Sequence, residues 1–130
     1  MRLLLDTNAL LWRLEDLAVE SSAAQVAFDR ASETFVSVVA FAEIGIKTAV
    51  GKLKIPPDLR ERVHELGIQM LALAPEHGLG VARLPLHHRD PFDRLLVAQA
   101  LHEGMAIVTS DRRLAAYDVE TYLVTRQRPR

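Results

Sequence analysis

The sequence predicts a three-layer α/β/α sandwich around a central, mostly parallel sheet of four to five strands. Short apolar or β-branched segments alternate with longer segments of helical periodicity along the whole chain, which is typical of strands joined by crossover helices. The first strand, over 2–5, is apolar enough to be buried on both faces. The 130 residues are expected to form one domain over 1–130, with 126–130 as a frayed tail.

The first half of the chain is predicted to contain two strands and three helices. In order, we expect a strand over 2–5, a helix capped by Thr7 or Asn8, a helix over 21–32, a strand over 33–39, and a helix over 40–53 that ends near Gly51.

The second half repeats this alternation. Pro57 is expected in the first turn of a helix over 55–67, and the helix over 90–104 has Asp90 as its cap, Pro91 at its first position and Gly104 as its stop. The remaining elements are a strand over 68–73, a weaker helix over 75–84, a strand over 105–110, a short helix over 111–117 and a strand over 121–125.

Composition excludes several classes of protein. The chain is 49% hydrophobic and 25% charged, as in globular proteins, and its lack of cysteine excludes disulfides, thiolate zinc sites and a cysteine nucleophile. No signal peptide or membrane span is expected, so we predict a cytoplasmic protein without membrane contact. The net charge of -1 predicts no general affinity for nucleic acid. The 13 Arg against 3 Lys indicate either a local anion-binding surface or a coding bias toward Arg.

Four acidic residues fall where expected strands end or the next helices begin. Asp6 and Asp111 directly follow strands, and Glu43 and Asp93 lie in the first turns of helices. Ligands bind at the carboxyl ends of parallel strands, so all four map to one rim of the sheet. Two carboxylates 4 Å apart repel each other by about 4 kcal/mol at an effective dielectric constant near 20. Either some of the acids are protonated or a cation lies among them, and for a cation the oxygen ligands favour Mg²⁺ or Mn²⁺.

Each acid also has a local explanation. Asp6 and Asp111 can cap the helices that follow them, and Asp93 can partner a cap at Asp90. Glu43 can pair with Lys47 one helical turn later. These alternatives stay open for each acid alone, whereas the coincidence of four favours a common site.

Four segments together resemble the PIN domain family and, within it, the VapC-type toxins of bacterial toxin–antitoxin pairs. They are "LLLDTNALLW", "AEIGIKTAVGKL", "HHRDPFDRLLVAQAL" and "AIVTSDRRLAAY", and the likeness extends over nearly the whole chain. The resemblance implies a Mg²⁺- or Mn²⁺-dependent endoribonuclease that acts on cellular RNA, is inhibited by a VapB-type antitoxin and forms a homodimer. The implied catalytic and metal-binding residues are Asp6, Glu43, Asp93 and Asp111, supported by Thr7, Asn8, and Thr109 or Ser110. Asp90 fits better as the helix cap with a supporting role.

The corresponding mechanism is hydrolysis of a phosphodiester by metal-activated water. Four arginines flank the expected rim and are either RNA-phosphate contacts or ordinary solvated residues: Arg89, Arg94, Arg112 and Arg113. Trp12 is expected in the core, with a groove for an antitoxin helix as the alternative.

The histidines show no spacing typical of a zinc site. His87 and His88 are expected in a loop, and His64, His77 and His102 at the surface or at helix ends. Two other functions are considered: a catalytically silent PIN-like module that binds RNA or a partner, and a receiver-like signalling domain. The second ranks lower because Asp6 has no acidic partner near the first strand.

Overall fold

The computed structural model of the chain describes residues 1–15 and 22–124. Within these residues, five parallel strands form one sheet in the order β3-β2-β1-β4-β5. The central strand β1 pairs with β2 on one side and with β4 on the other, so the strand order reverses between β1 and β4. The strands are β1 (Arg2–Leu5), β2 (Glu33–Ser37), β3 (Gln69–Leu71), β4 (Ala106–Thr109) and β5 (Thr121–Leu123).

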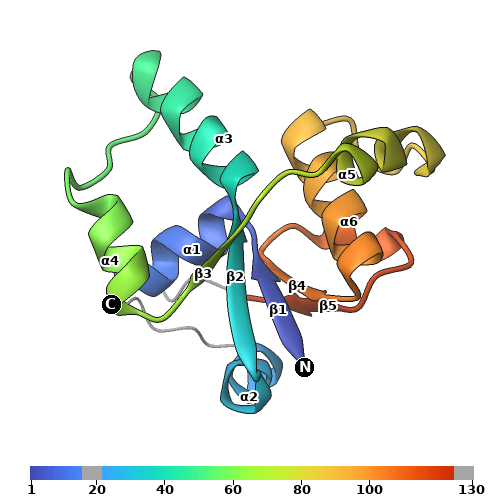
Figure 1. Cartoon of the computed structure of the whole chain (residues 1–130), viewed down its shortest axis with the longest axis horizontal. Coiled ribbons are helices and arrows are strands. Elements are labelled where there is room, and N and C mark those ends of the chain that lie inside the picture. Colours follow the sequence, from blue (N-terminus) through green and yellow to red (C-terminus); the bar gives the residue numbers. More distant parts are fainter. Residues whose placement is uncertain (16–21, 125–130) are drawn as a thin grey trace.

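Helices cover both faces of the sheet, which confirms the predicted α/β/α class. Figure 1 shows α1 and α4 on one side of the strands and α5 and α6 on the other. The α-helices are α1 (Thr7–Leu14), α2 (Ser22–Arg30), α3 (Val38–Ala49), α4 (Leu59–Glu65), α5 (Pro75–Gly80) and α6 (Pro91–Glu103). Two short 3₁₀ helices, η1 (Val81–Arg83) and η2 (Arg112–Ala116), complete the described elements.

The two faces of β1 supply two separate hydrophobic cores. Leu3 and Leu5 point to one face and Leu4 to the other, because successive side chains of a strand alternate. The first core includes residues of α1, α2, α3 and α4, and the second is built mainly on α6 and η2. All three leucines are completely buried, as is typical of the central strand of a parallel sheet. Trp12 packs half-buried against the first core.

Three helices begin elsewhere than predicted, and two of them begin at a capping side chain. The cap of α1 is Asp6 rather than Thr7 or Asn8. Strand β2 ends at Ser37, whose side chain accepts the Val39 N–H, so α3 begins two residues earlier than predicted. Helix α4 begins only at Leu59, after the two prolines, so Pro57 is not in its first turn.

The helix that carries Asp93 has the predicted ends. Asp90 caps α6, Pro91 occupies its first turn, and Gly104 ends it in the left-handed conformation with φ of 68°. Elsewhere the elements are shorter than predicted: β3 covers three residues, the expected helix over 75–84 divides into α5 and η1, and the segment after Asp111 is a 3₁₀ helix. The expected frayed tail over 126–130, Ser21 and Thr125 lie outside the described residues.

A membrane-spanning helix is absent from residues 1–15 and 22–124, since none of their helices combines the required length and hydrophobicity.

Candidate active site

A polar cleft of about 210 Å³ opens at the rim of the sheet where β1 and β4 end. All four predicted acids line it, although they come from four different parts of the chain. The lining residues are Asp6, Thr7, Asn8, Glu43, Lys47, His88, Asp90, Asp93, Asp111 and Arg113. The parallel sheet therefore brings the predicted acids together.

Asp6 follows β1 directly and uses its two oxygens differently. Its Oδ1 accepts the backbone N–H of Ala9 at 2.8 Å, which caps α1, and its Oδ2 accepts the hydroxyl of Thr109 at 2.5 Å. Only 5% of the residue is exposed, and this burial raises the pKa of Asp6 to about 6 despite both hydrogen bonds. Asp6 is thus both a helix cap and a buried acid of the cleft.

Glu43 projects into the cleft from α3 and is neutralised by a neighbour on the same helix. Its Oε1 accepts the hydroxyl of Thr7 at 2.7 Å, and its Oε2 lies 2.5 Å from Nζ of Lys47. This hydrogen bond to Glu43 is the main reason that the pKa of Lys47 is raised. The predicted pair between Glu43 and Lys47 is therefore present inside the cleft.

Asp93 enters the cleft from the first turn of α6. Its backbone N–H donates to Oδ1 of Asp90 at 3.0 Å, as the predicted cap requires. Its carboxylate faces Nε2 of His88 at 3.1 Å instead of returning to the backbone N–H of Asp90. Burial, and next the negative charge of Asp90, raise the pKa of Asp93 to about 7.

Asp111 follows β4 and is held by basic groups on both oxygens. Its Oδ1 accepts the backbone N–H of Arg113 and so caps η2, while the guanidinium of Arg113 contacts both carboxylate oxygens at 3.1 and 2.9 Å. His88 Nε2 lies 2.9 Å from Oδ2. The hydrogen bond from the Arg113 side chain is the main cause that lowers the pKa of Asp111 to about 2.

His88 is a residue of the cleft that the sequence prediction missed. It is 6% exposed, and its Nε2 contacts both Asp93 and Asp111. The sequence shows only a histidine two residues before a helix cap, and its partner Asp111 is 23 positions away. No local spacing could have identified this contact, because the sheet and α6 create it.

The supporting residues divide into those that touch the acids and those that do not. The hydroxyls of Thr7 and Thr109 donate to Glu43 and Asp6. Among the described residues, neither Thr109 nor Ser110 lines the cleft, but the hydroxyl of Thr109 donates to Asp6, so Thr109 is the one of the two that supports an acid. Asn8 lines the cleft and is exposed.

The four arginines have different surroundings. Arg94 donates to the carbonyls of Val81 and Pro85 and to the hydroxyl of Tyr117, so its guanidinium holds the loop before α6 and is not a free phosphate contact. Arg113 lines the cleft, whereas Arg89 and Arg112 are exposed but outside its lining.

The sequence predicts His77 at the surface or at a helix end: it is buried, with 1% exposed, and lies in the six-residue helix α5, so only the helix-end alternative holds. His64 and His102 are exposed, and His87 and His88 lie in a loop as predicted.

The charge distribution in the cleft fits a hard cation. Lys47 and Arg113 neutralise Glu43 and Asp111, while the pKa values of Asp6 and Asp93 are raised because burial disfavours their charged forms. Asp93, Asp111 and His88 bring three potential ligand atoms within 4.8 Å of one another. The donors around the cleft are mainly carboxylate oxygens, which suit Mg²⁺ or Mn²⁺ better than softer metals.

The sequence of the chain matches a known protein family. The PIN domain family model matches residues 3–120, and the chain belongs to this family. It is 30% identical over 122 residues to ribonuclease VapC22 of Mycobacterium tuberculosis, a match that covers 88% of this chain and 90% of that protein. The chain is thus a VapC-like member of the PIN domain family.

Solved structures with the same fold include toxin–antitoxin complexes. The crystal structure of VapBC2 from Rickettsia felis, bound to a DNA fragment from its promoter, contains a chain that superposes with a TM-score of 0.69 at 12% identity, covering 96% of this chain and 100% of that one. DNA-bound VapBC from Salmonella typhimurium gives a TM-score of 0.65 at 14% identity, over 94% of this chain and 97% of that one. At these identities the likeness establishes the fold.

Proposed function

We propose that this protein is a Mg²⁺- or Mn²⁺-dependent endoribonuclease and the toxin component of a toxin–antitoxin pair. The observation that carries the proposal is the cleft that gathers Asp6, Glu43, Asp93 and Asp111 at the strand ends. Its acids are partly buried, and two have raised pKa values. A relative of 30% identity is a ribonuclease by name, which supports the same class of reaction.

Asp6, Asp93 and Asp111 would hold the divalent cation, with Glu43 beside them. When bound, such a cation lowers the pKa of a water molecule toward about 7 and neutralises charge that develops on the phosphoryl oxygens. Binding of the cation would stabilise the charged forms of Asp6 and Asp93 most. Among the described residues, no Lys or Arg side chain forms an ion pair with either of them, whereas Lys47 forms one with Glu43.

The chain's own residues fix the acids in place. Thr109 orients Asp6 and Thr7 orients Glu43 through hydroxyl hydrogen bonds, which limits the rotation of each carboxylate. Glu43 is suited to orient the attacking water or to share a second cation. Lys47 and Arg113 place positive charge at the cleft, where a phosphodiester must approach an otherwise acidic surface.

Exposed arginines near the cleft extend this positive surface. Arg89 and Arg112 are exposed, and each lies in the chain between two residues that line the cleft, so both are candidates for contacts to RNA phosphates. Arg94 is not proposed for this role, because its guanidinium is engaged with the loop.

A VapB-type antitoxin and a second copy of the chain are the proposed protein partners. The support is the likeness in fold to chains of VapBC complexes. Trp12 packs against the first core while staying half-buried, which leaves part of its ring available to a docking helix. A Trp12→Ala variant that folds but binds the antitoxin more weakly would favour that use over a purely structural one.

Expression in bacteria tests the enzymatic proposal. Wild-type protein should arrest growth and degrade RNA, whereas Asp6→Asn should do neither, because the asparagine keeps the cap of α1 but removes the carboxylate. The matched control is Asp58→Asn, since Asp58 is exposed at the start of α4 and makes no capping hydrogen bond through its side chain. Equal toxicity of wild type and Asp6→Asn would contradict catalysis and favour a silent binding module.

The products of purified protein acting on RNA test the proposed chemistry. Hydrolysis by activated water leaves a 5′-phosphate and a 3′-hydroxyl, and the activity should disappear in EDTA and return with Mg²⁺ or Mn²⁺. A 2′,3′-cyclic phosphate product, or activity that persists in EDTA, would exclude this route.

A further inference from the structure

His88 is fixed in the cleft by contacts to its backbone and to its ring. Its backbone N–H donates to the hydroxyl of Tyr117 at 3.0 Å, and its carbonyl accepts from Arg94 Nη1 at 3.4 Å. Its ring atom Nδ1 accepts the backbone N–H of Asp90 at 3.0 Å. Tyr117 is itself buried in the second core, so the loop that carries His88 is tied to the rigid part of the fold.

These contacts determine which ring nitrogen carries the proton. Since Nδ1 accepts a hydrogen bond from a backbone N–H, it has no hydrogen, and the neutral ring carries its proton on Nε2. That Nε2–H faces Oδ2 of Asp111 at 2.9 Å and Oδ2 of Asp93 at 3.1 Å. One donor therefore bridges two carboxylates, one from α6 and one from the end of β4.

We propose that His88 is a positioning residue that holds the carboxylates of Asp93 and Asp111 together for the divalent cation, as a hydrogen-bond donor and not as a ligand. The inference rests on the proposed function, because it assigns His88 a role toward the same cation. His88 contacts the Oδ2 atom of each acid, so Oδ1 of Asp93 stays available to the cation.

The alternative, direct coordination by His88, conflicts with the contacts of its ring. Coordination through Nε2 requires a lone pair there, so the proton would have to move to Nδ1. The backbone N–H of Asp90 would then face another N–H, and the helix cap that positions Asp93 would lose a hydrogen bond. The same loop geometry that orients α6 thus keeps His88 a donor.

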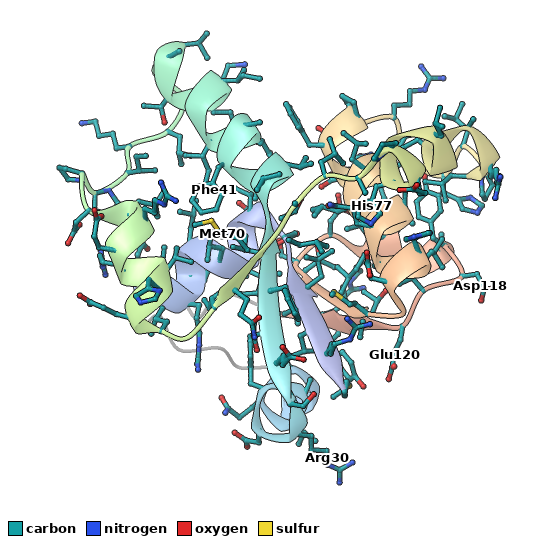
Figure 2. The ribbon with its side chains drawn as sticks, in the orientation of Figure 1. Arg30, Phe41, Met70, His77, Asp118 and Glu120 are labelled. Atoms are coloured by element: carbon teal, nitrogen blue, oxygen red, sulfur yellow. The ribbon has the colours of Figure 1, made fainter. Side chains whose placement is uncertain are left out.

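His77 provides a natural control, because it has the same hydrogen-bonding pattern away from the cleft. Its Nδ1 accepts the backbone N–H of Ala74 at 2.9 Å, and its Nε2 lies 3.0 Å from Oε1 of Glu103. Figure 2 shows His77 between α5 and α6. Although His77, His102 and Glu103 are close enough to suggest a metal site, the occupied Nδ1 of His77 assigns it a structural role.

Two substitutions test the hydrogen bonds of the two His88 ring nitrogens one at a time. Asparagine places an acceptor near the position of Nδ1 but lacks a donor at that of Nε2, whereas glutamine places a donor near Nε2 but loses the acceptor for Asp90. Dissociation constants for Mn²⁺ should be measured by titration calorimetry on full-length wild type, His88→Asn, His88→Gln and His77→Asn, with urea unfolding in EDTA as the check on folding.

Partners that hydrogen-bond to metal ligands typically change metal affinity by about 10–100-fold. We expect His88→Asn to bind Mn²⁺ about tenfold or more weakly than wild type, His88→Gln to stay within about threefold, and His77→Asn to match wild type. If His88→Asn binds as tightly as wild type, or His88→Gln as weakly as His88→Asn, the positioning role is wrong. If wild type itself binds no Mn²⁺, both the proposed function and this inference fail.

A spectroscopic measurement on wild type alone distinguishes donor from ligand without any variant. Electron spin echo envelope modulation of the Mn²⁺-loaded protein should show no strong coupling to ¹⁴N, because the nearest ligands are carboxylate oxygens. The strong ¹⁴N coupling of a coordinated imidazole would overturn the assignment of His88 as a donor.

Discussion

The hydroxyl of Thr109 donates a hydrogen bond to Oδ2 of Asp6, joining two residues that are 103 positions apart in the chain. The same hydroxyl accepts the backbone N–H of Asp111 at 3.0 Å. Because β1 and β4 are neighbours in the sheet, Thr109 at the end of β4 can contact both Asp6, which follows β1, and Asp111, which follows β4. One buried side chain therefore positions two of the four acids.

Removing this hydroxyl should destabilise the protein and disturb the site. Thr109→Val keeps the shape but removes the hydrogen bond to Oδ2 of Asp6 and the acceptor of the Asp111 N–H, so we expect a loss of about 1–3 kcal/mol in the free energy of unfolding. The pKa of Asp6 should also rise further, since this hydrogen bond lowers it. Urea unfolding measures the first effect, and NMR titration of the carboxyl measures the second. Thr109→Ser keeps the hydroxyl, so its free energy of unfolding and its Asp6 pKa should stay close to those of wild type. Equal changes in Thr109→Val and Thr109→Ser would argue against the hydrogen bond.

The stability of the metal-free protein should fall as the pH rises from about 4 to about 7. Asp6 and Asp93 have pKa values of about 6 and about 7 in the folded state and 3.8 as the ordinary value, so in this window the folded state binds more protons than the unfolded state. The sign of the linkage then makes unfolding easier with increasing pH, by at most about 7 kcal/mol for the two acids together. Asp111 acts oppositely and only below its ordinary pKa of 3.8, where its protonation toward pH 2 costs stability. Urea unfolding in EDTA across this range measures the trend, and a rise in stability between pH 4 and pH 7 that Asp93→Asn does not change would contradict it.

Asp93→Asn should stabilise the metal-free protein and abolish its response to the cation. At pH 8 the substitution removes a partly buried negative charge that is disfavoured by burial and by Asp90, so we expect a gain of about 1–3 kcal/mol in EDTA. Mn²⁺ should raise the melting temperature of wild type but not of this variant, because binding to the folded state is what stabilises it. Thermal unfolding with and without Mn²⁺ measures both effects. Equal stabilisation of the two proteins by Mn²⁺ would remove Asp93 from the proposed ligands.

Asp90 should contribute as a cap rather than as a ligand. Asp90→Asn keeps an acceptor for the Asp93 N–H, so its stability and its response to Mn²⁺ should stay close to those of wild type. Asp90→Ala should lose about 0.5–2 kcal/mol, because the first turn of α6 loses that acceptor. Chemical unfolding and Mn²⁺ titration separate these roles, and loss of Mn²⁺ binding in Asp90→Asn would make Asp90 part of the cation site.

Arg113 should contribute to the electrostatic part of RNA binding. If it contacts one phosphate, Arg113→Gln should reduce the slope of log K against log salt by about 0.7 for single-stranded RNA. It should also raise the pKa of Asp111 toward its ordinary range. Binding of RNA in EDTA at several salt concentrations measures the slope. Arg60→Gln, on the exposed face of α4, is the control, and an unchanged slope in Arg113→Gln would confine its role to pairing with Asp111.

Much of the fold could be predicted from local patterns in the sequence. The apolar run over 2–5, the Asp90-Pro91 start and Gly104 stop of α6, and the alternation of strands with helices all reflect interactions within a few residues, so the sequence predicts them directly. The errors occurred where two local signals compete. Val38 and Val39 favour a strand by their β-branched side chains, but Ser37 caps a helix there and the turn at the rim of the sheet favours the cap.

Less of the site could be predicted from the sequence. Its four acids could be assigned to one rim because parallel strands all point their carboxyl ends to the same edge. Their charge states could not be predicted from the sequence. Burial raises the pKa of Asp6, whereas the guanidinium of Arg113 lowers the pKa of Asp111, although both groups are aspartate carboxyls. Arg94 and Arg113 likewise carry the same charge, but only the folded loop shows that Arg94 is engaged with backbone carbonyls.

By itself, the sequence determined the order and type of the main elements and the edge at which the acids gather, since hydrophobic periodicity and capping act over one or two helical turns. Only the tertiary structure decided that Thr109 holds Asp6 and that His88 bridges Asp93 and Asp111. These contacts join side chains from different strands and helices, and their distances depend on how the whole sheet and α6 pack together.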